Sequence, residues 1–180
     1  MARLFAFAAT LLSITAASPA FADNLDDCSR GAYAGEGVQA CSDIIANATP
    51  TLRAVAYVYR GIAFQVRGDL DKAIDDFTFA IQANPSLANG YAHRGLVYAN
   101  RKDLAHALAD YNEAIRLAPD AGEIFYARGL AEMDTGDTAQ AISDFKVTIR
   151  SLPETNLARA NAVSALAALG VDVTSGKATP

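Results

Sequence analysis

Apolar residues recur through the middle of the chain with the three-to-four-residue spacing of amphipathic helices. Two helical faces follow one another in the first such stretch: Tyr57, Gly61 and Phe64 form one, and Ala73, Phe77, Ala80 and Ile81 form the next. A short polar turn at Gly68 and Asp69 separates them. The pattern predicts a pair of antiparallel helices joined by a hairpin.

The same pattern returns at a fixed step of 34 residues. The repeated positions are Arg60, Arg94 and Arg128; Gly61, Gly95 and Gly129; Ala73, Ala107 and Ala141; and Pro85, Pro119 and Pro153. Because four different positions recur at the same spacing, the sequence indicates three copies of one helix pair. Each copy closes at its proline, because the residue before a proline is pushed out of helical geometry.

Each hairpin turn is predicted to cap the helix that follows it. The turns are Gly68-Asp69, Lys102-Asp103 and Gly136-Asp137. An aspartate at this position accepts a hydrogen bond from the free N–H groups at a helix start. The repeated Gly and Ala residues are expected to let the paired helices approach to the short end of the ~8–10 Å packing range.

The repeat resembles the tetratricopeptide repeat, whose motif has a large residue, a small one and an aromatic, then Ala, an aromatic, Ala and Pro. The first copy has Tyr57, Gly61, Phe64, Ala73, Phe77, Ala80 and Pro85; the second has Tyr91, Gly95, Tyr98, Ala107, Tyr111, Ala114 and Pro119; the third has Phe125, Gly129, Ala141, Phe145 and Pro153. In the third copy, Glu132 replaces an aromatic and Thr148 the last Ala. We therefore expect its helices to pack less tightly.

The resemblance implies an all-α solenoid of three helix-turn-helix repeats in a right-handed superhelix, at residues 54–87, 88–121 and 122–155. Residues 23–53 and 156–170 are expected to form helical caps, because each repeat contacts only its neighbours. In the first cap, residues 40–45 resemble a second repeat helix without its full partner. Gly170 is a common helix terminator, and residues 171–180 are expected to form a loose tail.

The first 22 residues have the features of an export signal. Arg3 gives a positive start, Leu4–Ala17 is an apolar stretch, and Ala20-Phe21-Ala22 has the small-x-small pattern of a cleavage site. A membrane anchor is the alternative, but the stretch is shorter than the ~20 apolar residues that cross a bilayer, and Pro19 ends it. We expect a protein of the periplasm, or one otherwise secreted, with no membrane insertion after cleavage.

Cys28 and Cys41 are the two cysteines of the chain. In an oxidising compartment each has the other as its only partner, so the sequence predicts a disulfide that ties the incoming strand to the first cap. Closing so short a loop would stabilise the fold by about 3 kcal/mol. Two buried free thiols are the alternative.

Composition and charge narrow the classes of function. The chain is 52% hydrophobic and 19% charged, which is typical of compact folds. Its formal net charge of -5 becomes one unit more negative if cleavage removes Arg3. Basic residues are scattered singly apart from Arg101 and Lys102, whereas nucleic acid or an anionic lipid surface requires clusters of them. The composition argues against both of those ligands.

The sequence offers no convincing catalytic or metal-binding set. His93 and His106 lie on different helices of the second repeat and form no ligand cluster with the cysteines. The repeated glycines have the spacing of helix packing and not that of a phosphate-binding loop. We therefore expect no cofactor, no metal and no enzymatic activity. A hydrolytic enzyme would need a pocket that joins His93 or His106 to an acid.

Arginines and aspartates also recur at the 34-residue step. Arg60, Arg94 and Arg128 precede the repeated glycines, and Asp76, Asp110 and Asp144 lie on the second helices. The pattern predicts a ladder of surface Arg–Asp pairs that contribute ~0–1 kcal/mol each. The alternative is a row of arginines that anchors a ligand.

The family geometry places the first helices along a concave inner wall, where partners generally bind. By register, the groove residues are Val55, Val58, Ile62, Gln65, Asn89, Ala92, Leu96, Ala99, Glu123, Tyr126, Leu130 and Met133. Family members that clamp a chaperone's C-terminal carboxylate have Lys and Asn at places that here hold Val58, Ile62, Ala92 and Leu96. A carboxylate clamp is therefore not expected. Neighbouring elements that cover part of the groove are the alternative to an open wall.

These features predict a non-catalytic adaptor that binds a protein or peptide with an apolar face. An apolar groove rimmed by Asn89, Asn100 and Glu123 suits an amphipathic helix or an extended hydrophobic segment. Leu96, Tyr126 and Leu130 are the expected anchors. The alternative is a structural protein that assembles into a homo-oligomer through the array ends or the groove.

Overall fold

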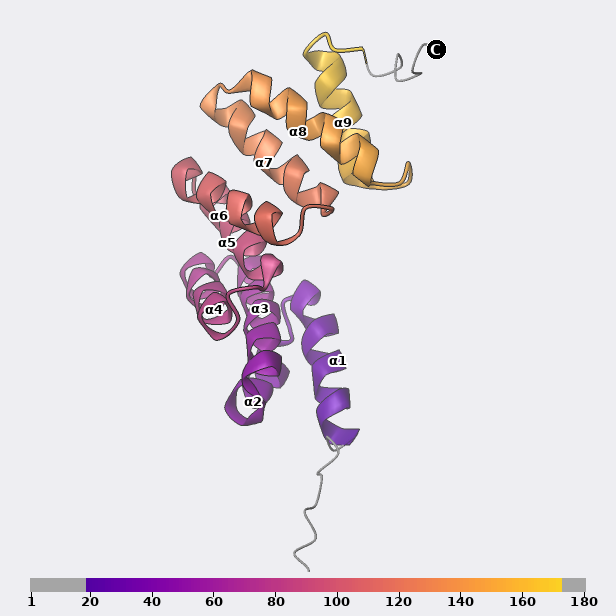
Figure 1. Ribbon diagram of the computed structural model, residues 1–180. Helices are drawn as coiled ribbons and strands as arrows, with labels where there is room; N and C mark the ends of the chain where they lie inside the picture. Colours follow the sequence, from indigo (N-terminus) through magenta and orange to yellow (C-terminus); the bar gives the residue numbers. More distant parts are fainter. Residues whose placement is uncertain (1–18, 173–180) are drawn as a thin grey trace, which may run out of the picture.

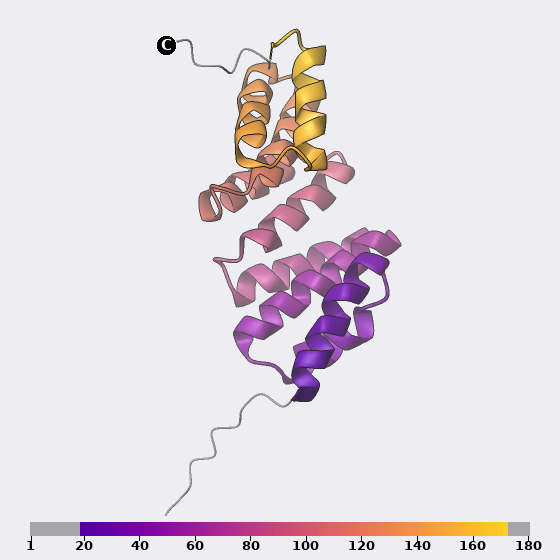
Figure 2. The same cartoon turned by 90° about the vertical axis from the view of Figure 1, so that its right-hand side faces the viewer.

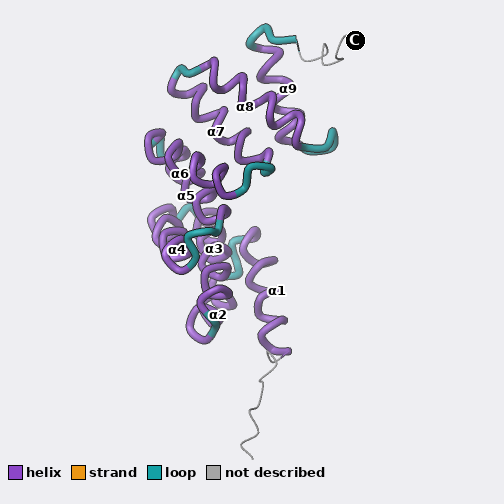
Figure 3. Tube along the Cα trace, viewed as in Figure 1, coloured by secondary structure: helices purple, strands orange, loops and turns teal. Residues whose placement is uncertain are grey.

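A computed structural model describes residues 19–172 of the chain (Figure 1). Every regular element in this part is a helix (Figure 3). The helices are α1 (Pro19–Ala34), α2 (Val38–Asn47), α3 (Pro50–Arg67), α4 (Leu70–Ala83), α5 (Ala88–Asn100), α6 (Leu104–Leu117), α7 (Gly122–Thr135), α8 (Thr138–Ser151) and α9 (Leu157–Ala168). The expected all-α solenoid is confirmed.

The three repeats are the helix pairs α3–α4, α5–α6 and α7–α8, stacked in chain order along the array (Figure 1). The first helices α3, α5 and α7 contact one another along one side, and the second helices lie on the other side. Helix α3 begins at Pro50, ahead of the position at which the motif begins. Proline is tolerated there because the N–H of a first helical residue has no partner within the helix.

In each of the three repeats, an aromatic ring on the second helix packs against a glycine on the first helix. A Cβ added to Gly61 would lie 2.6 Å from the ring of Phe77. The corresponding distances are 3.0 Å from Gly95 to Tyr111 and 2.7 Å from Gly129 to Phe145. The three rings are fully buried. The ring therefore occupies the space that a side chain would need, which is why this position of the motif holds a small residue.

The N-terminal cap differs from the prediction. The segment around Cys28 belongs to helix α1, which packs against both α2 and α3. Helix α2, which contains residues 40–45, therefore has a full helical partner. The turn between α1 and α2 is tight, because a Cβ on Gly37 would stand 2.6 Å from the carbonyl oxygen of Cys28.

The two ends of the chain are described in part. Of the predicted export signal at residues 1–22, only 19–22 fall within the described residues, and they begin α1. At the other end, α9 stops at Ala168 and Gly170 has a φ of 72°, so a glycine in the left-handed conformation follows the helix. Most of the predicted tail, residues 173–180, lies outside the described part.

Two of the three predicted aspartate caps are present. Asp103 accepts a hydrogen bond from the backbone N–H of His106, and Asp137 accepts one from that of Gln140. The prediction for Asp69 is wrong, since its side chain caps no N–H. Its carboxylate instead lies 3.1 Å from Nζ of Lys72, in the next turn of the helix.

The Arg–Asp pairs are not surface pairs, which corrects that expectation. In each repeat the guanidinium donates two hydrogen bonds to the aspartate at distances of 2.7–2.8 Å, and the aspartates are buried. A third bond reaches back to the preceding second helix, from Arg60 to Ser42, Arg94 to Thr78 and Arg128 to Asn112. Each arginine therefore joins three helices. The carboxylate bond raises the pKa of all three arginines, so they stay charged.

We predict that Gly95→Leu lowers the free energy of unfolding by about 2–3 kcal/mol, because the new side chain collides with the ring of Tyr111. Urea unfolding measures the loss. Ala105→Leu adds the same side chain at an exposed position of α6 and serves as the control. Equal stabilities for the two variants would contradict the glycine–aromatic account.

We predict that Asp110→Ala costs about 3 kcal/mol, since it leaves the mostly buried Arg94 without its carboxylate. The matched control is Glu113→Ala on the same helix, which removes an exposed pair with Arg116. Thermal unfolding of the two variants should show a large shift for Asp110→Ala and almost none for the control. Similar shifts in both would mean that the buried pair is no stronger than a surface pair.

Candidate functional site

The side of the array formed by the first helices carries a row of three adjoining hollows, which we call the concave groove. Their volumes are about 260, 250 and 520 Å³. The first hollow lies among α1, α3 and α5, and it shares Asn89 and His93 with the second. The second shares Leu96, Tyr111 and Ala127 with the third. The hollows therefore form one continuous groove that runs to the end of α7.

Most of the predicted groove residues line these hollows. The first hollow takes Val55, Val58, Ile62 and Asn89; the second takes Asn89, Ala92, Leu96 and Glu123; the third takes Leu96, Ala99, Tyr126, Leu130 and Met133. Gln65 lines none of the three. The apolar side chains of Leu96, Leu130 and Met133 are exposed, at 38%, 44% and 36%. The wall formed by α5 and α7 is therefore open and apolar.

Val58 and Ile62 line the first hollow but are not exposed as Leu96 and Leu130 are, which agrees with the alternative that neighbouring elements cover part of the groove. They are only 5% and 4% exposed, and they form one buried cluster with Ala32 of α1. Figure 2 shows α1 and α9 on the side that faces the viewer, toward opposite ends of the array. Helix α1 thus covers the part of the wall that α3 provides. The repeat register could not show this, because α1 lies outside the repeats.

Sequence reasoning missed several residues of the groove. Tyr59 and His93 line the first hollow, and Ala127 lines the other two. These three residues are themselves spaced by 34, two positions before each repeated glycine, so the repeat pattern did contain a signal for them. Tyr33 on α1 had no such signal, yet it lines the first hollow with its side chain 65% exposed.

The charged residues at the rim of the groove are paired within the chain. Nζ of Lys102 lies 2.8 Å from a carboxylate oxygen of Asp134, which joins the turn after α5 to the end of α7. Glu123 accepts a hydrogen bond of 3.0 Å from the side-chain amide of Asn156. Burial lowers the pKa of His93, whose ring stacks on Phe77, so this side chain is neutral at pH 7. The groove is therefore mainly apolar, and Glu123 keeps its negative charge at the rim, because the amide of Asn156 is neutral.

The second hollow is lined by both His93 and an acid, Glu123, whose carboxylate accepts a hydrogen bond from Asn156. Nδ1 of His106 lies 2.7 Å from Asp103, but that carboxylate also accepts the backbone N–H of His106, so the pair belongs to the cap of α6. His93 packs on an aromatic ring. Within residues 19–172, no group of three or more His, Cys, Asp and Glu side chains could hold a metal ion. Nor is any helix in this range long and apolar enough to cross a membrane.

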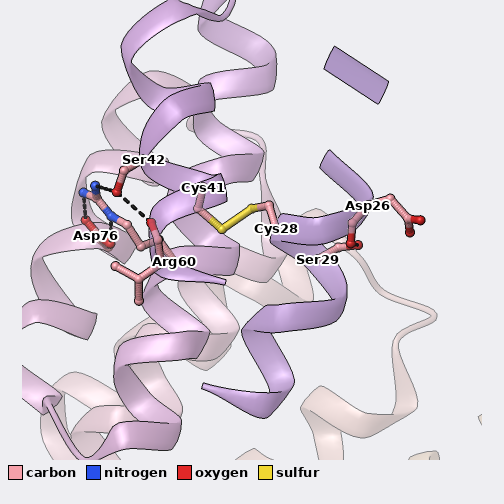
Figure 4. Close-up of a disulfide and its surroundings, with 8 residues drawn as sticks. Asp26, Cys28, Ser29, Cys41, Ser42, Arg60 and Asp76 are labelled. Atoms are coloured by element: carbon pink, nitrogen blue, oxygen red, sulfur yellow. Dashed lines mark hydrogen bonds and ion pairs between the residues drawn. A yellow bond between two sulfur atoms is a disulfide. The ribbon is translucent and has the colours of Figure 1, made fainter. Parts of the chain in front are cut away.

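Cys28 and Cys41 form a disulfide that joins α1 to α2 (Figure 4). Both cysteines are fully buried, in a cluster with Ile44 and Ala56. The Arg60–Asp76–Ser42 network lies close to this disulfide (Figure 4). The disulfide thus joins the two helices of the cap to each other, and the hydrogen bond from Arg60 to Ser42 joins α3 to α2.

Glu132, which stands where the motif has an aromatic, is a buried acid on α7. One of its carboxylate oxygens lies 3.5 Å from Nε of Arg128, and the other has no hydrogen-bond partner among the described residues. Burial, followed by the charge of Asp144, raises the pKa of Glu132 to about 7, although Arg128 opposes the rise. The third repeat therefore contains a carboxyl group that titrates near neutral pH.

Comparison with known proteins agrees with this architecture. Residues 88–121, which contain α5 and α6, match the family model described as Tetratricopeptide repeat. No significant match is found among curated protein sequences. The fold is that of a helical-repeat solenoid with a groove along its first helices. Residues 88–121 thus match a tetratricopeptide repeat, and the described residues have the fold of tetratricopeptide-repeat domains.

Three solved structures illustrate the likeness. The second TPR domain of human RPAP3 in complex with the HSP70 peptide SGPTIEEVD has 26% identity and a TM-score of 0.60, covering 66% of this chain and 98% of that one. The Arabidopsis OM64 TPR domain has 20% identity and a TM-score of 0.62, over 67% and 99%. The thermophilic TPR protein TTC0263 of Thermus thermophilus has 23% identity and a TM-score of 0.62, over 73% and 72%. The last two show the fold alone.

We predict that Glu132→Gln raises stability at pH 8 by roughly 1–2 kcal/mol and leaves it almost unchanged at pH 4.5. The raised pKa means that the folded state binds more protons than the unfolded state between pH 4.5 and about 7. Its contribution to stability is therefore complete below pH 4.5 and is lost as the pH rises through 7. Chemical unfolding at several pH values measures the effect, and a difference that does not change with pH would contradict it.

Proposed function

We propose that the protein is an exported, non-catalytic adaptor that holds an apolar segment of a partner protein in the concave groove. The observation that carries the proposal is the exposed wall of α5 and α7. Leu96, Leu130 and Met133 surround the largest hollow there and leave large apolar side chains in water. An apolar patch of this kind on a folded domain is typical of a protein-binding surface.

Similar domains support a protein or peptide as the ligand. The second TPR domain of human RPAP3 is in complex with an HSP70 peptide, and the second TPR of Spaghetti is bound to the HSP90 peptide SRMEEVD. Both peptides are acidic and end in Val-Asp. The places where carboxylate-clamping relatives have Lys and Asn hold Val58, Ile62, Ala92 and Leu96 here. The proposed partner is therefore apolar in its contact face and does not depend on a terminal carboxylate.

The chemistry of the groove defines the partner further. The third hollow is lined mainly by the side chains of Leu96, Leu104, Tyr126, Leu130 and Met133. Burial of such surfaces stabilises a complex by ~25 cal/mol per Å² of apolar area before the costs of association. Lys102 already has an opposite charge in Asp134, so it requires none from the ligand, whereas Glu123 has only the neutral amide of Asn156. An amphipathic segment with leucine-like anchors fits these conditions.

Export of the protein is part of the proposal. The N-terminal 22 residues have a positive start, an apolar stretch and a small-x-small end, and the disulfide of Cys28 and Cys41 is a bond that persists in oxidising compartments. The periplasm is the proposed location, with secretion as the alternative. Cleavage after Ala22 would leave a mature chain in which α1 begins at Asp23.

We predict that Leu96→Glu reduces recovery of bound partner at least tenfold in affinity capture from the exported fraction, because it places a charge where two hollows meet. Leu157→Glu is the matched control, since Leu157 is 74% exposed and lies outside the hollows. The captured proteins are identified by mass spectrometry. Partner recovery that is the same for Leu96→Glu and for the unaltered protein would refute the groove as the binding site.

Light scattering on the same three proteins separates a partner from self-assembly. A monomer with a captured partner supports the adaptor. An oligomer that Leu96→Glu dissociates would assign the groove to a second copy of this chain and contradict the adaptor. An oligomer that only Leu157→Glu dissociates would place self-contact at the end of the array, away from the groove.

A further inference from the structure

We propose that α1 is a built-in occupant of the concave groove and that the Cys28–Cys41 disulfide holds it there. The proposal concerns how access to the groove is controlled, and it rests on the proposed function of that groove. In this state the wall of α5 and α7 is open, whereas Val58 and Ile62 of α3 are almost fully buried. Release of α1 would add the wall of α3 and lengthen the groove to all three repeats.

The repeat register shows what α1 occupies. Val58 and Ile62 of α3 correspond, at steps of 34, to Ala92 and Leu96 of α5 and to Tyr126 and Leu130 of α7. Ile62 is 4% exposed, whereas Leu96 and Leu130 are 38% and 44% exposed. The three residues hold one position in three copies of one unit. The difference in exposure arises from α1, because Ala32 packs in the same buried cluster as Val58 and Ile62.

The non-covalent attachment of α1 relies on few of its own side chains. Among its residues from Asn24 onward, only Cys28 and Ala32 have fully buried side chains, and Leu25 is partly buried. Among its residues from Asn24 onward, α1 places no aromatic ring on any of the glycines as Phe77, Tyr111 and Phe145 do. After cleavage behind Ala22, α1 would keep residues 23–34 only, a length that is marginal for an isolated helix in water. Beside its packing against α2 and α3, the disulfide to α2 is the covalent restraint on α1.

The connection between α1 and α2 is suited to act as a hinge. Gly35 has a φ of 75°, and Gly31 and Gly37 approach each other too closely for a side chain on either. Arg67 at the end of α3 donates a hydrogen bond to the carbonyl of Gly35. This bond fixes the hinge and not the body of α1. When the disulfide is absent, α1 can swing away about this point while α2 stays bound to α3 through Ser42 and Arg60.

The test compares the protein with its disulfide formed and the double variant Cys28→Ser/Cys41→Ser. Hydrogen exchange followed by mass spectrometry is measured for the peptides of α1 and of α5–α8. We expect exchange in α1 to accelerate at least tenfold and exchange in α5–α8 to stay within about twofold, as local opening requires. Because the chain contains no tryptophan, Tyr33→Trp adds a single probe on α1, and its fluorescence anisotropy should fall in the disulfide-free background.

Two results would overturn the proposal. Unchanged α1 exchange in the folded double variant, with unchanged anisotropy of the introduced tryptophan, would show that side-chain packing alone holds α1. Faster exchange throughout α5–α8 as well would show that the disulfide is a general stabiliser of the array. Reduction of the unaltered protein by dithiothreitol gives a second route to the same comparison without substitution. None of these readouts involves a partner, so their failure is distinct from failure of Leu96→Glu to reduce partner capture.

Discussion

In every repeat, an aromatic ring on the second helix lies against the backbone of a glycine on the first, and the rest of the array depends on this contact. It sets the distance within each helix pair, because any side chain at Gly61, Gly95 or Gly129 would occupy the place of the ring. Pairs of equal thickness can then stack at a constant step. The stacking aligns α3, α5 and α7 in one wall, and that wall is what makes a groove.

A second interaction fixes each pair to the one before it. The three repeated arginines bind an aspartate within their own repeat and a polar side chain on the preceding second helix. Burying a charge is costly unless it is paired and fully hydrogen-bonded, so this network favours one angle and one register between repeats. The same rule explains why Glu132 is unusual. It is a second carboxyl beside Arg128, and its burial, followed by the charge of Asp144, raises its pKa to about 7.

The 34-residue period was enough to predict what the repeats share. It gave the helix pairs, the glycine–aromatic positions and the alignment of Leu96 with Leu130. It could not give the environment of a residue that something outside the repeats covers, such as Ile62. It also could not tell a buried Arg–Asp pair from a surface pair, since burial depends on how neighbouring helices stack. Asp69 shows a local limit: a lysine one turn away competes for the carboxylate that would otherwise cap the helix.

Identical repeats would present identical binding surfaces, and a specific groove therefore requires that the symmetry be broken. Here the break comes from α1, a helix that carries no repeat residues and lies on the wall of the first repeat only. Differences between the repeats also make the wall uneven. The position that is Ala92 in α5 is Tyr126 in α7. Covering α3 limits an apolar surface that would otherwise extend along the whole array and attract unrelated hydrophobic segments. The part that stays open is short, and it is bounded by α1 at one end. A partner is then selected by whether its apolar face fits that length.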